Sequence, residues 1–152
     1  MTNDTADWIE QAVDFYSTHC LGLTEWNISI CIEYAIDDDA GILGMCTQQP
    51  STNYAQVSFR GDIADTEHWH TTIIHELLHI KHSRIDDYLR EVAFDALPPK
   101  MSNIVNKTYV NVVYEPFIHD MAYYLAKSLY PLWCDYRDSV DDEEDTADAT
   151  VE

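Results

Sequence analysis

Basic residues are scarce in this chain, and their scarcity limits the partners that it can have. The sequence holds 8 Lys and Arg residues against 28 Asp and Glu, a formal net charge of −20 at pH 7. A surface of this sign repels phosphate backbones, so we expect no direct binding to nucleic acid. It attracts a basic protein or peptide, although solubility or a salty environment explains the charge equally well.

Long hydrophobic runs, targeting segments and paired cysteines are also missing. No apolar stretch approaches the roughly 18 residues of a membrane span, so we expect no membrane association. The first residues, Met1 to Asp4, carry neither basic charge nor an apolar stretch, which argues against a secretory signal. The four cysteines lack C-x-x-C spacing and are more typical of free thiols in a reducing cytoplasm than of disulfides or a Cys-based zinc site. We therefore expect a cytoplasmic protein.

One short motif carries most of the chemical information, and it reads His75-Glu76-Leu77-Leu78-His79. Positions four apart in a helix lie on one face, one turn along the axis, so the two imidazoles can hold one metal ion. Glu76 lies beside them, where its carboxylate can take a proton from a water on that metal. A catalytic zinc ion of this type needs a third protein ligand from elsewhere in the chain.

The alternative interpretation of this motif is a pair of histidines on a solvated helix surface. Its surroundings argue against that, since the neighbouring residues are mostly apolar and make the helix largely buried. These apolar neighbours are Ile73, Ile74, Leu77, Leu78 and Ile80. We expect the helix to span about 65–83, with a polar stripe of Thr72 and the motif histidines facing a cleft.

The remaining histidines are expected to lie outside the metal site. His82 is on the same face as the motif, but a straight helix cannot easily bring three successive turns of histidine around one ion. We assign His82 to the cleft or the surface. His68 and His70 are expected to be exposed residues of the first turn, and His19 is expected at a helix end, where the dipole favours it.

A later helical segment, 111–130, supplies the candidates for the third ligand. Glu115 and His119 are four apart and therefore share a face, and two small alanines follow them and allow a close approach to the metal helix. Either side chain can bind the ion while the other orients a ligand by hydrogen bonding. Pro116 disfavours helical backbone at the residue before it, so this helix either begins at Pro116 or is kinked there.

Two segments together resemble a known family: T-I-I-H-E-L-L-H-I at 72–80 and E-P-F-I-H-D-M-A-Y-Y-L-A at 115–126, preceded by a strand-rich half. They are similar to the small H-E-x-x-H proteins of bacteriophages and mobile elements, zinc metallopeptidases of minimal gluzincin type. The resemblance implies that His75, His79 and Glu115 bind Zn²⁺, that Glu76 is the general base, and that the host cell is bacterial or archaeal. His119 stands where an aspartate is usual in the family, so it is the alternative ligand or supports one by hydrogen bonding.

The rest of the chain predicts an α+β fold, a minimal zincin-like domain in which a small three-stranded sheet packs on the metal helix and on the Glu115 helix. We expect helices at 5–20, 65–83, 84–96 and 111–130, strands at 26–36, 42–48 and 54–59, a turn at 37–41 and an irregular stretch at 98–110. Strand 54–59 is expected to be an edge strand, on which an extended substrate can add itself.

The domain is expected to end at 134. Residues 135–152 hold nine acids and one arginine, which predicts a solvated, disordered tail. Residues 1–134 then form a single domain, a size sufficient for one hydrophobic core.

Three functions are compatible with this sequence. The preferred one is a zinc metallopeptidase that hydrolyses peptide bonds of an intracellular protein, with Tyr109, Tyr114 or His119 as a further donor to the developing oxyanion. The second is a zinc-stabilised binding module in which Glu76 has no catalytic role. The third is an acidic DNA mimic that binds a nucleic-acid-binding protein.

Overall fold

The computed structural model describes residues 4–33, 43–61, 64–94 and 96–148. The turn expected at 37–41 and the last residues of the strand expected at 26–36 lie outside these ranges. The helices are α1 (Asp4–Phe15), α2 (Glu67–Tyr88), α3 (Pro99–Thr108) and α4 (Glu115–Asp148), and the strands are β1 (Asn27–Glu33), β2 (Gly44–Gln49) and β3 (Tyr54–Arg60). Three π-helical turns adjoin the helices: η1 (Tyr16–Cys20), η3 (Leu89–Phe94) and η4 (Tyr109–Tyr114). The expected α+β class is confirmed.

The three strands form one sheet in the order β1-β3-β2, so the prediction that 54–59 is an edge strand was wrong. β3 runs parallel to β1 and antiparallel to β2. Its central place agrees with its burial, because Ala55, Val57, Ser58 and Phe59 are all at most 2% exposed. A central strand has partners on both edges, which satisfies its backbone groups. Among the described strands, β2 is therefore an edge, and it is the one that lies against α2.

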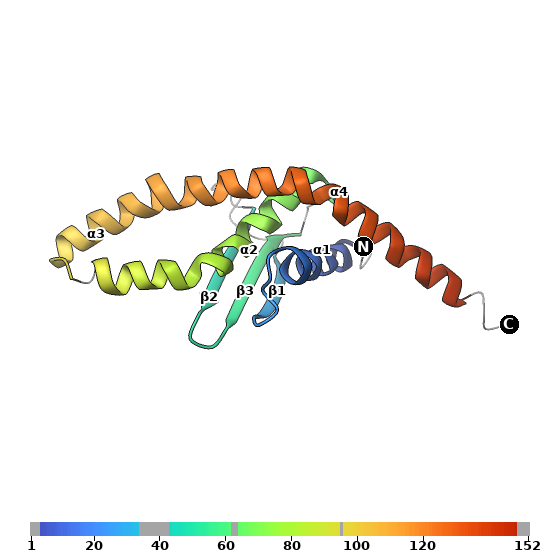
Figure 1. The fold of residues 1–152 in the computed structure, drawn as a ribbon, viewed down its shortest axis with the longest axis horizontal. Coiled ribbons are helices and arrows are strands. Elements are labelled where there is room, and N and C mark those ends of the chain that lie inside the picture. The colour runs from blue at the N-terminus through green and yellow to red at the C-terminus, as the bar shows by residue number, and fades with distance from the viewer. Residues whose placement is uncertain (1–3, 34–42, 62–63, 95, 149–152) are drawn as a thin grey trace.

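Helix α2 is the centre of the fold and packs against the sheet on one side and α4 on the other (Figure 1). Its apolar residues Ile73, Ile74 and Leu77 are completely buried, as expected. The helix does not end near Ser83 but continues to Tyr88 and on into η3, so the separate helix predicted at 84–96 was wrong. No glycine or proline interrupts this stretch, which is helical through Phe94, and Pro98 and Pro99 follow shortly after.

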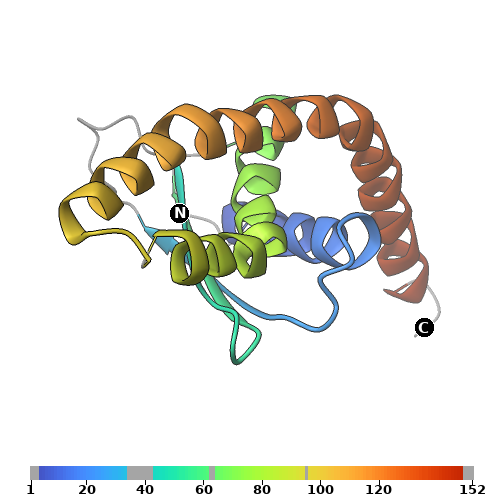
Figure 2. The same ribbon diagram turned by 60° about the vertical axis from the view of Figure 1, so that its left-hand side comes forward.

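The stretch at 98–110, predicted to be irregular, is helical. Pro99 occupies the start of α3, where its fixed φ and missing N–H are tolerated. The chain then remains helical through η4 into α4, which forms a long arch over α2 and bends along its length (Figure 2). Pro131 lies at the middle of α4, and a proline inside a helix is a usual cause of such a bend. Pro116 does not interrupt this helical run. Glu115, the residue before it, has helical angles of φ −61° and ψ −46°. The Glu115 N–H donates a hydrogen bond to the carbonyl of Val110, and this wider π-type turn makes room for the proline ring.

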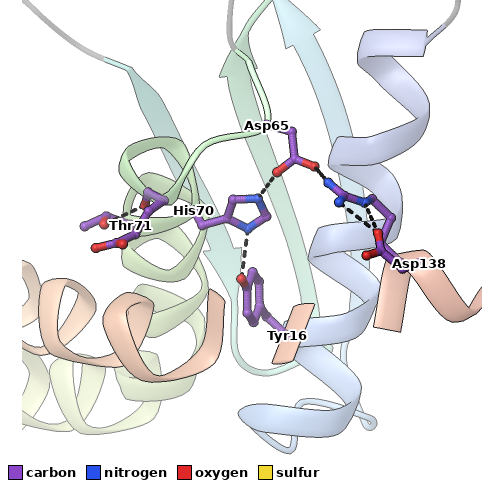
Figure 3. Close-up of polar contacts among 7 residues, drawn as sticks. Tyr16, Asp65, His70, Thr71 and Asp138 are labelled. Atoms are coloured by element: carbon purple, nitrogen blue, oxygen red, sulfur yellow. Dashed lines mark hydrogen bonds and ion pairs between the residues drawn. The ribbon is translucent and has the colours of Figure 1, made fainter. Parts of the chain in front are cut away.

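A buried polar chain joins the start of α2 to the N-terminal helix and to α4 (Figure 3). His70 Nδ1 lies 2.9 Å from the Tyr16 hydroxyl, and its Nε2 lies 2.7 Å from Asp65, whose other oxygen accepts a hydrogen bond from Arg137 at 2.7 Å. His70 is completely buried, so its predicted exposure was wrong. The sequence could not place Asp65 and Tyr16 on its two nitrogens, and without such partners a histidine at this position would belong at the surface.

Of the segment expected to be a disordered tail, 135–152, the structure describes 135–148 as the end of helix α4. Tyr136 packs against the core, and Arg137 makes the ion pair with Asp65. These contacts come from the far side of the expected boundary at 134. None of the helices in the described part of the chain combines the length and the hydropathy needed to span a bilayer. All four cysteines are free, as expected.

Candidate metal centre

The two motif histidines project from the same face of α2 and meet at their tips. The Nε2 atoms of His75 and His79 are 3.1 Å apart, and the rings are nearly perpendicular, at 75°. Both side chains are largely enclosed, at 20% and 14% exposure. The helical spacing predicted from the sequence is thus present, and the two nitrogens point at a common position.

Glu115 at the start of α4 supplies a third oxygen to the same position. Its Oε2 lies 3.5 Å from His75 Nε2 and 3.6 Å from His79 Nε2. A tetrahedral zinc ion with bonds of about 2.0–2.1 Å holds its ligand atoms roughly 3.3 Å apart. The three measured separations are therefore close to the edges of one face of such a tetrahedron, and the fourth corner is left to a water or a substrate. This is the one group of metal-ligating side chains of this kind found among the described residues.

The other candidate histidines lie outside this group. His119 is exposed, and its ring centroid is 6.2 Å from that of His75. His82 is half-buried against Phe117, at 6.0 Å between ring centroids, while His68 and His19 are exposed. The structure thus places His82, His68 and His19 outside the group formed by His75, His79 and Glu115. Between Glu115 and His119, the geometry favours Glu115.

The protonation states of the histidines suit metal binding. Burial lowers the pKa of His75 to about 4, with a further contribution from His79. Burial also lowers the pKa of His79, against the opposing charge of Asp86. Both rings are neutral at physiological pH, so each keeps a nitrogen lone pair that can bind a metal without first losing a proton.

Glu76 is 6% exposed and lies where α2 approaches the first residue of β2. A Cβ atom added at Gly44 would be 3.0 Å from the Glu76 Cγ and 3.1 Å from its Oε1. Glycine at this position therefore lets the strand and the carboxylate lie this close together. Burial, followed by the charge of Glu115, raises the pKa of Glu76 to about 8. The sequence located Glu76 but gave no indication that Gly44 shapes its surroundings.

Tyr114 contacts the candidate metal ligand His79 on the side of its ring that faces away from His75 and Glu115. Its hydroxyl lies 3.4 Å from His79 Nδ1, the nitrogen that points away from Glu115 and His75. The Tyr114 ring stacks on Tyr109 at 5.8 Å between centroids. A partner on the second nitrogen fixes the orientation of a metal-binding imidazole. Tyr114, one of the predicted oxyanion donors, therefore lies against the candidate ligand His79.

Two cavities flank the proposed ion position, one on each side of Glu76. The first has a volume of about 550 Å³ and reaches from Gly44 past Thr72 to His119. The second, about 390 Å³, lies between α2, β2 and η4 and extends from His79 to Asp86 and Arg90. Both include His75, Glu76 and Gly44 in their walls. A chain passing over the three ligands would therefore find space on both sides.

Comparison with known proteins does not assign this chain to a family. No family model, no curated protein and no solved structure matches this chain.

Proposed function

We propose that this protein is a zinc-dependent metallopeptidase of the minimal gluzincin type, which hydrolyses peptide bonds of a protein substrate in the cytoplasm of a bacterial or archaeal cell. The observation that carries the proposal is the triangle of His75, His79 and Glu115 atoms at 3.1–3.6 Å, with Glu76 buried beside it. The resemblance to phage and mobile-element H-E-x-x-H proteins supports the same reaction.

His75, His79 and Glu115 would hold the ion, in a set of two nitrogens and one carboxylate that zinc accepts in catalytic sites. A bound zinc ion supplies Lewis acidity there, polarising a carbonyl oxygen and lowering the pKa of a coordinated water to about 7. Tyr114 keeps the His79 ring oriented through its hydroxyl, 3.4 Å from Nδ1.

Glu76 is the general base of the proposed reaction. Its pKa of about 8 applies to the protein without metal, and a cation on the neighbouring ligands favours the ionised carboxylate. The side chain then accepts a proton from the attacking water and delivers it to the departing amine nitrogen. Because Gly44 and α2 enclose it, the carboxylate has little freedom to turn away from the reacting atoms.

Strand β2 is the binding edge for an extended substrate in this proposal. It pairs with β3 on one side, and among the described strands none pairs with its other side. Gly44, Met45, Cys46 and Gln48 line the second cavity, so a peptide added along this edge would pass Glu76 and the ligands. In this proposal β2 has the substrate-binding role predicted for strand 54–59. The net charge of −20 favours a basic substrate.

Zinc binding and hydrolysis can be separated by two variants. We expect purified protein to bind one zinc ion per chain and to cleave a denatured basic protein in a chelator-sensitive manner. Glu76→Gln should keep the zinc and lose about 10²–10⁴-fold in rate, the usual contribution of a general base. Glu91→Gln, which changes an exposed glutamate in η3, is the matched control and should retain both properties.

Two outcomes would contradict the proposal. Cleavage that persists with chelator or in Glu76→Gln would show that another group, or a contaminant, performs the hydrolysis. Stoichiometric zinc with no cleavage of any substrate would favour the zinc-stabilised binding module.

A further inference from the structure

Asp86 has a buried carboxylate oxygen that no described residue satisfies. The residue lies on α2 seven positions beyond His79, is 6% exposed and forms part of the wall of the second cavity. Its Oδ2 accepts a hydrogen bond from Arg90 Nε at 2.7 Å, whereas its Oδ1 has no hydrogen-bond partner in the described part of the chain. A buried carboxylate oxygen without a donor is unfavourable, and such atoms are normally paired by protein, water or ligand.

The Arg90 pair leaves the negative charge of Asp86 only partly compensated. The Arg90 side chain is 43% exposed and is therefore solvated, while the Asp86 side chain is 7% exposed. The charge of Asp86 is also felt by its neighbours: burial first, and then this charge, raises the pKa of Tyr114. The second cavity thus offers an acceptor with negative charge at the end away from the metal ligands.

The position of Asp86 sets the length of a suitable ligand group. Seven residues along a helix correspond to about 10 Å between His79 and Asp86. A peptide held at the three metal ligands can reach Asp86 only with a long side chain that ends in a hydrogen-bond donor. Lysine, with an ammonium on a four-carbon stem, and arginine, with its guanidinium, meet both requirements.

We propose that the second cavity is a specificity pocket for a lysine or arginine side chain of the substrate, which the Asp86 carboxylate recognises. The inference rests on the proposed function in that the peptide lies across the metal ligands, but it concerns binding and not turnover. The overall negative charge predicts a preference for basic substrates, and this pocket locates that preference at Asp86.

The test measures peptide binding and does not require hydrolysis. Capped alanine-based peptides carry one lysine, moved stepwise along the chain, and a second series carries norleucine, which has no charge, at the same positions. Binding is measured by fluorescence anisotropy with metal-free protein and with zinc-loaded Glu76→Gln protein. Each form is compared with Asp86→Asn and with Asp87→Asn. Asp87 is the adjacent residue, is half-exposed and lines neither cavity, so it is the matched control.

We expect lysine at one position to bind at least tenfold more tightly than norleucine, which corresponds to about 1.4 kcal/mol. Asp86→Asn should abolish this preference, and Asp87→Asn should retain it. A preference that is absent, or that survives in Asp86→Asn, overturns the inference. The inference is also overturned if Asp86→Asn loses zinc affinity but keeps the preference for lysine, because Asp86 then acts on His79 through Tyr114. A lysine preference in a protein that cleaves nothing supports the pocket and contradicts only the proposed hydrolysis.

Discussion

The candidate ligand atoms of His75, His79 and Glu115 form a triangle, which we call the ligand triangle. Replacing Glu115 by alanine removes one of its corners and should weaken zinc binding strongly. Among the residues that the structure describes, Glu115 is the one carboxylate whose oxygen lies within 3.6 Å of both motif imidazoles. Without it, two histidines remain, and they are fewer than the three protein ligands of a catalytic zinc site. His119, the alternative candidate, is exposed and lies on a different side of His75, so it should not replace the lost oxygen.

The size of the effect can be expressed as a shift in melting temperature. At a zinc concentration 100 times the Kd of the wild-type protein, binding stabilises the fold by about 2.7 kcal/mol. For a chain of 152 residues this corresponds to a rise in Tm of about 5–10 °C. Losing a hydrogen-bonding neighbour of a ligand costs 10–100-fold in affinity, so losing the ligand itself should cost at least about 100-fold. The same zinc concentration then stabilises Glu115→Ala by only about 0.4 kcal/mol, or about 1 °C.

The assay is a thermal melt of metal-free protein with and without zinc, for the wild type, Glu115→Ala and His119→Ala. We expect His119→Ala to keep nearly the full zinc-dependent shift, since it carries the same truncation outside the ligand triangle. The coordination that we propose is refuted if Glu115→Ala retains the shift, or if His119→Ala loses it.

Three further changes test the surroundings of the ligands. Gly44→Ala introduces a Cβ atom 3.0 Å from the Glu76 Cγ, so kcat/KM should fall about 10–100-fold while a zinc titration shows unchanged affinity; unaltered kinetics would contradict the close packing. Tyr114→Phe removes the hydroxyl at His79 Nδ1 and should weaken zinc binding about 10–100-fold in a competition assay, and an unchanged Kd would exclude this role. Burial lowers the pKa of His70, so below about pH 6.5 the unfolded chain binds more protons than the folded chain, and the free energy of unfolding decreases as the pH is lowered. In urea melts at pH 7.5 and pH 5.5, His70→Gln should therefore lose less stability on acidification than the wild type. An equal loss would refute the lowered pKa of His70.

The elements with a clear hydrophobic period were predictable from the sequence. The alternation at 26–36 and the apolar residues around the histidine motif located β1 and α2, and the motif itself located three of the four proposed site residues. Glu115 was one of two candidates, because helical spacing alone cannot tell which side chain of a shared face points at a partner helix.

The remaining features depend on contacts between distant segments. Strand order is not encoded in any single strand, although the buried small residues Ala55 and Ser58 are consistent with a central strand. The helix at 99–108 is amphipathic but buries none of its residues completely, and it follows Pro98 and begins at Pro99, which are typical of a break between helices. His70 could not be recognised as buried, because its partner Tyr16 is 54 positions away and the nearby Asp65 precedes the helix, where spacing does not predict the contact.

The ion pair between Asp65 and Arg137 determines how this protein can be shortened. A fragment that stops at residue 134, the boundary suggested by composition, lacks the guanidinium that neutralises Asp65 and leaves His70 hydrogen-bonded to an uncompensated carboxylate. The ion pair holds together the two helices that carry the candidate ligands. Asp65 lies just before the first turn of α2, and Arg137 lies about 33 Å along α4 from Glu115. Removing the acidic end therefore releases one support of the three candidate ligands, and a shortened chain for metal titration needs to extend at least through Arg137.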